Sequence, residues 1–99
     1  MSQCFVSPTA SRDLDAIGDY FVARNIEAGE RLLREFVKKC ENLVKFPNMG
    51  RSYDRIKPGL RGVPLDGYII FYRVVENGIE ILRVVSGYQE FEAMFPDET

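Results

Sequence analysis

The sequence of 99 residues contains no histidine, and this absence limits the chemistry that its side chains can perform. Histidine is the usual general base near neutral pH, and its absence excludes Ser-His and Cys-His nucleophile pairs and histidine-based zinc sites. The two cysteines, Cys4 and Cys40, are too few for a disulfide framework and lack metal-site spacing. We expect both to be buried free thiols in a reducing cytosol, with no metal and no cofactor.

Basic side chains are the remaining groups of chemical interest, and they outnumber acidic ones only in the segment 45–88. Residues 45–88 hold seven basic and four acidic side chains, whereas residues 89–99 hold four acidic side chains and no basic one. The net charge of −2 therefore masks a basic middle segment. The same net charge argues against a protein whose affinity comes mainly from neutralising phosphates.

Two helices precede most of this basic segment. Ser7 followed by Pro8 is typical of a helix start, and apolar residues then recur at helical spacing as far as Phe21. A short break at residues 25–27 separates a second, longer amphipathic helix, which must end before Pro47. Two amphipathic helices joined by so short a break predict an antiparallel helical hairpin.

Short apolar segments predict the strands, and Asp66-Gly67 and Asn77-Gly78 predict tight turns between the last three. Pro64 places its strand at a sheet edge or a bulge. The predicted strands are residues 3–6, 60–65, 68–75 and 79–85. The order β-α-α-β-β-β predicts an α+β fold, with the helical hairpin packed on one face of a small antiparallel sheet.

The chain length predicts a single domain over residues 1–99, with a short C-terminal helix within residues 88–95 as a further expectation. No apolar segment is long enough to span a bilayer, and the N-terminus is not a secretory signal. We therefore expect a cytoplasmic protein that makes no membrane contact.

Two arginines lie inside the predicted strands, and their placement depends on the last hairpin. With Asn77-Gly78 as its loop, Tyr72 lies opposite Arg83 and Arg73 lies opposite Leu82. The two arginines then occupy opposite faces of the sheet. At least one of them is expected to approach the core or to line a concave surface.

Four sequence blocks in succession resemble the ParE/RelE superfamily, the toxins of type II toxin–antitoxin (plasmid-stabilisation) modules. The first is Ser-Pro-x-Ala-x-x-Asp-Leu-x-x-Ile at residues 7–17, and the second is Phe-Pro-x-Met-Gly-Arg at 46–51. The third is Leu60-Arg61 followed by the Gly-Tyr strand at 67–74, and the fourth is Ile-Leu-Arg-Val-Val-Ser-Gly at 81–87. The blocks cover about nine-tenths of the chain and agree with the predicted element order.

The resemblance implies one of two activities. RelE-like members are ribosome-dependent endoribonucleases that cut mRNA, whereas ParE-like members inhibit DNA gyrase by protein–protein contact; an antitoxin neutralises both. Three positions where the nucleases carry catalytic arginines or a tyrosine are Ile69, Gln89 and Phe95 here. None of these can act as a base or stabilise charge in phosphodiester cleavage. The chain is therefore similar to the ParE-like branch, and we expect it not to be an enzyme.

The partners implied by the resemblance are a cognate antitoxin, encoded by an adjacent gene, and DNA gyrase, without sequence-specific nucleic acid binding by the toxin alone. The expected partner-binding residues are Arg51, Arg61, Arg73, Arg83, Tyr88, Phe91 and Phe95. Structural roles are the alternatives: Arg51 at the carboxyl end of the long helix, and Arg73 and Arg83 paired with carboxylates or stacked on tyrosines. Apolar residues expected to be exposed at the partner site include some of Ile26, Phe36, Phe91, Met94 and Phe95.

Two alternative functions stay open. A divergent RelE-like nuclease would use Arg61, Arg83 and Tyr88 for catalysis. A degenerate member would only bind its antitoxin, and the slightly acidic composition, unlike that of the typical basic toxin, favours this alternative.

Overall fold

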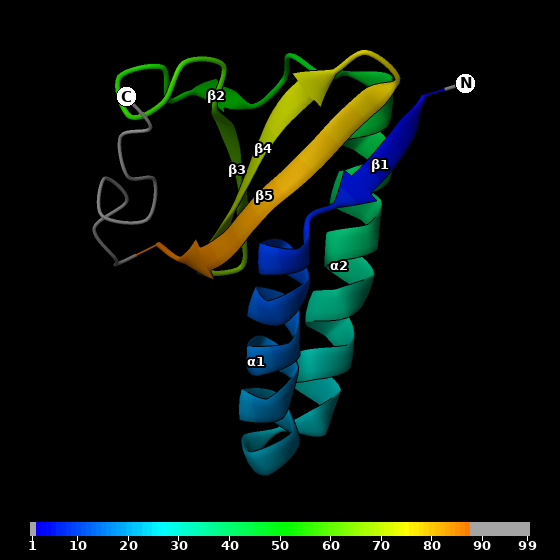
Figure 1. Cartoon of the computed structure of the whole chain (residues 1–99). Coiled ribbons are helices and arrows are strands. Elements are labelled where there is room, and N and C mark those ends of the chain that lie inside the picture. Colours follow the sequence, from blue (N-terminus) through cyan, green and yellow to red (C-terminus); the bar gives the residue numbers. More distant parts are fainter. Residues whose placement is uncertain (1, 88–99) are drawn as a thin grey trace.

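The computed structural model describes residues 2–87, which form a five-stranded sheet with two helices packed on one of its faces (Figure 1). The strand order across the sheet is β1-β5-β4-β3-β2, so the first and last strands of the chain are neighbours. The predicted α+β class and order of elements are confirmed. The elements are β1 (Gln3–Val6), α1 (Pro8–Arg24), α2 (Ile26–Lys45), β2 (Arg51–Ser52), β3 (Arg61–Leu65), β4 (Tyr68–Val75) and β5 (Gly78–Ser86).

The helical hairpin forms as predicted, and single residues cap its helices. Ser7 accepts a hydrogen bond from the backbone N–H of Ala10, and Pro8 occupies the first helical position. Asn25 alone separates the two helices: its backbone N–H closes α1, and its side chain accepts a hydrogen bond from Ala28 to begin α2. The break is thus shorter than expected. Figure 1 shows the joined ends of both helices reaching beyond the sheet. Neither helix in residues 2–87 has an apolar segment of the length needed to cross a membrane.

The sheet is mixed, which corrects the prediction of an antiparallel one. β1 pairs in parallel with β5, whereas β2, β3, β4 and β5 pair antiparallel in succession. The helical hairpin returns the chain to the end of the sheet where β1 began. β3 therefore runs in the direction of β1, β4 reverses, and β5 again runs in the direction of β1.

The two predicted turns differ in outcome. Asp66 and Gly67 both have positive φ angles, 46° and 87°, so they form the expected two-residue turn between β3 and β4. In the second hairpin Val75 pairs with Gly78, so the loop is Glu76-Asn77 and the predicted register was wrong. Gly78 is instead a strand residue with φ 142°, where an added Cβ would lie 1.9 Å from the carbonyl oxygen of Gln3. The close approach of β1 requires this glycine.

A bulge in β5 also corrects the predicted placement of the two strand arginines. Tyr72 lies opposite Ile81, and the next pair is Phe71 with Arg83, so Leu82 is an extra residue in β5. Arg73 lies opposite Glu80 on the face that also carries Phe71. Cross-strand partners share a face, so Arg73 and Arg83 lie on the same face and not on opposite ones.

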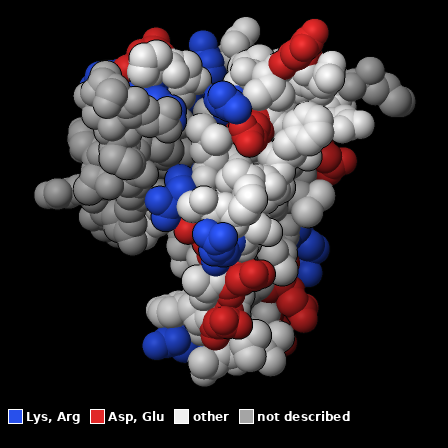
Figure 2. Space-filling view, in the orientation of Figure 1, with Lys and Arg blue, Asp and Glu red and all other residues white. Residues whose placement is uncertain are grey.

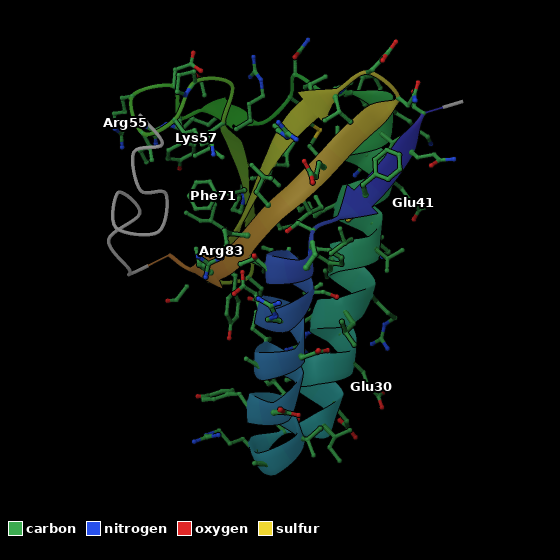
Figure 3. The ribbon with its side chains drawn as sticks, in the orientation of Figure 1. Glu30, Glu41, Arg55, Lys57, Phe71 and Arg83 are labelled. Atoms are coloured by element: carbon green, nitrogen blue, oxygen red, sulfur yellow. The ribbon has the colours of Figure 1, made fainter. Side chains whose placement is uncertain are left out.

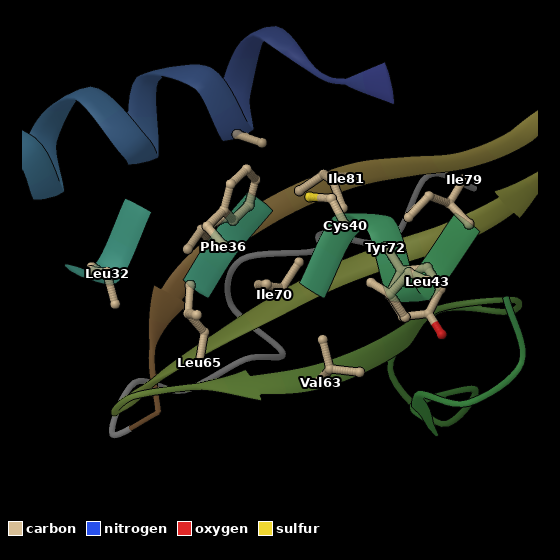
Figure 4. Packing of buried hydrophobic residues seen from close by; sticks show 12 residues of the cluster. Leu32, Phe36, Cys40, Leu43, Val63, Leu65, Ile70, Tyr72, Ile79 and Ile81 are labelled. Carbon is tan, nitrogen blue, oxygen red and sulfur yellow. The ribbon is translucent and has the colours of Figure 1, made fainter. Parts of the chain in front are cut away.

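The main core lies between the helices and the sheet (Figure 4). Its buried side chains come from α1, α2 and the strands β3 to β5, and Tyr72 and Leu43 among them are fully buried. A second, smaller cluster lies on the opposite face of the sheet. Its buried members are Tyr53, Leu60, Phe71 and Val85. The helices thus fix one face, while the loop between β2 and β3 packs on the other.

The edge of the sheet at β2 was not predicted as a strand. β2 has only two residues, which pair with Arg61 and Gly62 of β3. Beyond Gly62 the strand β3 has no neighbour on that side among the described residues, and Pro64 lies in this free part. The predicted edge position of Pro64 is therefore confirmed.

Candidate interaction surface

Arg61, one of the expected partner-binding residues, holds the segment that follows α2. Its guanidinium donates hydrogen bonds to the carbonyl oxygens of Asn48 (3.2 Å) and Gly50 (2.8 Å). The hydroxyl of Tyr72 binds the same segment, donating to Pro47 O (2.6 Å) and accepting from Gly50 N–H (2.9 Å). Burial raises the pKa of the Tyr72 phenol, so the hydroxyl keeps the proton that it donates. The two side chains position the loop that leads into β2.

That loop presents arginines around an aromatic ring. The guanidinium carbons of Arg51 and Arg55 lie 5.5 Å and 5.6 Å from the ring centroid of Tyr53, within the range of cation–π contacts. Arg51 belongs to β2 and is exposed, beyond the end of α2 at Lys45. Figure 3 shows Arg55 and Lys57 near each other on this loop. We name Arg51, Tyr53, Arg55 and Lys57 the basic loop surface.

Arg73 pairs with Glu80 across the β4–β5 hairpin, as the carboxylate alternative predicts. Its Nε lies 2.7 Å from a carboxylate oxygen of Glu80. The side chains are 55% and 26% exposed, so solvent screens much of their attraction. This pair leaves the arginine accessible to a partner.

Arg83 is bound more firmly, to Asp13 of α1. Its Nε and one terminal nitrogen donate to the two carboxylate oxygens at 2.8 Å and 3.1 Å. Asp13 also accepts the backbone N–H of Val84 at 2.9 Å, so one carboxylate joins α1 to the edge of β5 beyond β1. The hydrogen bond to Asp13 raises the pKa of Arg83. The carboxylate pairing expected for Arg83 is confirmed.

The residues of the nuclease alternative do not converge in the described part of the chain. Arg61 lies opposite Tyr72 on the helix-covered face, whereas Arg83 lies opposite Phe71 on the other face. Ile69, at the position of a nuclease arginine, packs against the apolar cluster of the second face. Four predicted site positions lie outside the described residues, namely Tyr88, Gln89, Phe91 and Phe95.

An apolar groove of about 220 Å³ runs between the two helices. Ile26 and Leu33 of α2 line it and are more than half exposed, whereas Phe36 is buried at its base. The expectation that some of these apolar residues are exposed is therefore confirmed at Ile26, whereas Phe36 packs into the main core; Met94 lies outside the described residues. We name this feature the helix groove. Charged side chains are scattered among uncharged ones on the face in Figure 2.

Comparison with known proteins places this geometry in a family. A model of the ParE toxin of type II toxin–antitoxin systems, parDE, matches residues 5–91. The chain belongs to the ParE toxin family. Toxin ParE1 of Mycobacterium tuberculosis, found in two strains, is 33% identical over 86 residues, covering 85% of this chain and 88% of the relative. Toxin ParE3 of Caulobacter vibrioides is 26% identical over 90 residues, or 90% of each chain.

A solved ParE-family structure supports the same assignment. The chromosomal ParDE TA system from P. aeruginosa contains a chain that matches with a TM-score of 0.71 and 28% sequence identity. The match covers 87% of this chain and 96% of that one. The predicted resemblance to the ParE-like branch is thus confirmed.

Sequence reasoning missed three residues that organise these surfaces. Asp13 lies in the first family block, but nothing in its spacing showed that it would bind Arg83. Tyr53 lies in a loop without periodicity, so its place between two arginines had no sequence signal. The anchoring role of the Tyr72 hydroxyl had no sequence signal, because Tyr72 lies in a strand whose residues, apart from Arg73, are all aromatic or aliphatic.

Proposed function

We propose that this ParE-family chain is the toxin of a type II toxin–antitoxin module and inhibits DNA gyrase by protein–protein contact. In this proposal a cognate antitoxin from an adjacent gene neutralises it, and it uses no cofactor and no catalytic residue. The family match over residues 5–91 is the observation that carries the proposal.

The arrangement of the arginines supports contact over catalysis. Cleavage of a phosphodiester needs a base and cations converging on one phosphate. Arg61 binds the segment that follows α2, whereas Asp13 of α1 already neutralises Arg83, so the two guanidinium groups have separate partners within the protein. Ile69 offers only an apolar side chain at a position where the related nucleases carry an arginine.

The helix groove supports the antitoxin part of the proposal. A groove lined by exposed apolar side chains of two helices fits an amphipathic segment of a partner. The related P. aeruginosa structure is described as a chromosomal ParDE TA system. We place the antitoxin in the helix groove, which leaves the basic loop surface for the target.

Arg51 and Arg55 are the most available of the arginines for that target. Both are exposed, and both guanidinium groups lie near the ring of Tyr53, with no carboxylate partner within residues 2–87. The remaining predicted contacts, Arg61, Arg73 and Arg83, each hold a hydrogen bond within the protein. Electrostatic complementarity then favours an acidic patch on gyrase as the contact.

The test combines a purified supercoiling assay with growth after induced expression. We expect the toxin to block supercoiling by gyrase, to cause filamentation, and to leave mRNA uncut on ribosomes. The double substitution Arg51→Glu and Arg55→Glu should weaken inhibition about tenfold or more, because it reverses both charges that would face the acidic patch. A tenfold loss corresponds to about 1.4 kcal/mol of binding free energy. Lys38→Glu is the matched control, because this lysine is 69% exposed on α2, away from the basic loop surface.

Other outcomes identify the alternatives. Growth arrest with intact supercoiling and cut mRNA would establish the nuclease, whose activity Tyr88→Phe should then abolish. No arrest at all, with an antitoxin complex still formed, would establish a member that has lost its toxicity.

A further inference from the structure

The two cysteines of the chain meet in one groove between the N-terminal strand and the long helix. Cys4 lies in β1 and Cys40 in α2, and both line a groove open to solvent. Cys4 packs against the main core cluster, of which Cys40 is a buried member, although the two residues lie far apart in the sequence. Figure 3 places Glu41, another residue of this groove, beside β1. Both cysteines are free thiols.

The two thiols are chemically unequal. Cys40 is 8% exposed, whereas Cys4 is only half-buried. The hydrogen bond from Cys40 lowers the pKa of the Cys4 thiol, because it stabilises the Cys4 thiolate. The same contact, together with burial and the nearby carboxylate of Glu41, raises the pKa of Cys40. Cys4 is therefore the better nucleophile and the more accessible one.

We propose that Cys4 and Cys40 are a redox modification site, at which hydrogen peroxide converts the thiol pair into a reversible intramolecular disulfide. The Cys4 thiolate attacks one peroxide oxygen, giving a Cys4 sulfenic acid and hydroxide. The Cys40 sulfur then attacks the sulfenic sulfur, the S–S bond forms, and water leaves with the Cys40 proton. Two thiols give up two electrons in total, and the peroxide is reduced to two waters.

This disulfide changes the attachment of β1. The strand has four residues, lies at the edge of the sheet and pairs only with β5 among the described elements. A covalent link at Cys4 ties it to α2 as well, and it closes the loop of chain that contains α1. The inference does not depend on toxin activity, because it concerns only the thiols and the fold.

The test uses the purified full-length chain, reduced and then treated with hydrogen peroxide at a modest excess. We expect both thiols to be lost together, the intact mass to fall by two hydrogens, and a non-reducing digest to contain a peptide linking Cys4 to Cys40. Dithiothreitol should restore both thiols. Closing the loop should raise Tm on the order of 10 °C, and amide exchange in β1 should slow more than tenfold.

Single substitutions provide the controls. Cys4→Ser leaves the fold intact, because Cys4 is half-buried, and it should abolish the linked peptide and the rise in Tm. Cys40→Ala removes the buried partner without adding a polar group, and it should give a Cys4 sulfenic acid that dimedone traps. The proposal is overturned if peroxide leaves the thiols reduced, gives only sulfinic acids, or gives only disulfides between separate chains.

Discussion

The two faces of the sheet are covered in different ways: helices cover the face that stabilises the fold, and a loop covers the face that we assign to recognition. On one face, two regular helices enclose the main core, in which Leu43 and Tyr72 are fully buried. On the other, the irregular loop between β2 and β3 lays Tyr53 and Leu60 on the sheet. The loop also carries the basic loop surface. The helix-covered face therefore stabilises the fold, while the smaller cluster on the other face positions the side chains of the basic loop surface.

The largest expected effect compares one leucine on each face. Leu43 and Leu60 are both buried, at 0% and 1% exposure, so truncation removes the same atoms from a closed site. We expect Leu43→Ala to cost about 3–5 kcal/mol and Leu60→Ala about 2–3 kcal/mol, because a loop can collapse into the cavity and a helix on a sheet cannot. Urea unfolding measures both. Equal losses would mean that the loop is as rigid as the helices.

An intermediate effect is expected where one carboxylate joins α1 to β5. Asp13→Asn keeps the shape of the side chain but removes the charge that binds Arg83, and it weakens the bond from Val84 N–H. Both partners are less than a quarter exposed, so we expect a loss of about 2 kcal/mol in the free energy of unfolding. Asp15→Asn, on the exposed side of the same helix, should cost much less. A similar loss in both variants would show that Arg83 gains little from its partner.

The smallest effect is expected at the exposed arginine pair. Glu80→Gln removes the partner of Arg73, but solvent already screens that pair, so we expect a change within about 0.5 kcal/mol. The measurement is Tm at low and high salt, where the small difference should shrink further as salt rises. A salt-independent loss comparable to that of Asp13→Asn would contradict the distinction between the two arginines.

Local patterns in the sequence were sufficient to predict most elements. The Ser7-Pro8 start, the helical spacing to Phe21 and the Asp66-Gly67 turn each depend on neighbouring residues, and each is confirmed. β2 escaped prediction because two residues carry no periodicity. The register of the last hairpin failed for a different reason. Gly78 looked like a turn residue, but the requirement for glycine comes from β1, which lies at the other end of the sequence.

The candidate surfaces were harder to predict than the fold. The sequence predicted that arginines would pair with carboxylates, but it did not predict the bulge at Leu82. That bulge determines on which face of the sheet Arg83 lies. A bulge shifts a strand by one residue, and nothing in the sequence of β5 indicates where it occurs. The position of Arg51 and Arg55 around Tyr53 depends on the tertiary path of a loop, which no periodic pattern encodes.

The pairing of β1 with β5 has a consequence for how the protein is made. Gln3 pairs with Gly78, so β1 has no neighbour in the sheet until the chain has been synthesised as far as β5. The helical hairpin contains only local contacts and can form early, but β5, which lies between β1 and β4, is the last strand to be made. A nascent chain therefore has no complete sheet until the whole of β5 has been made.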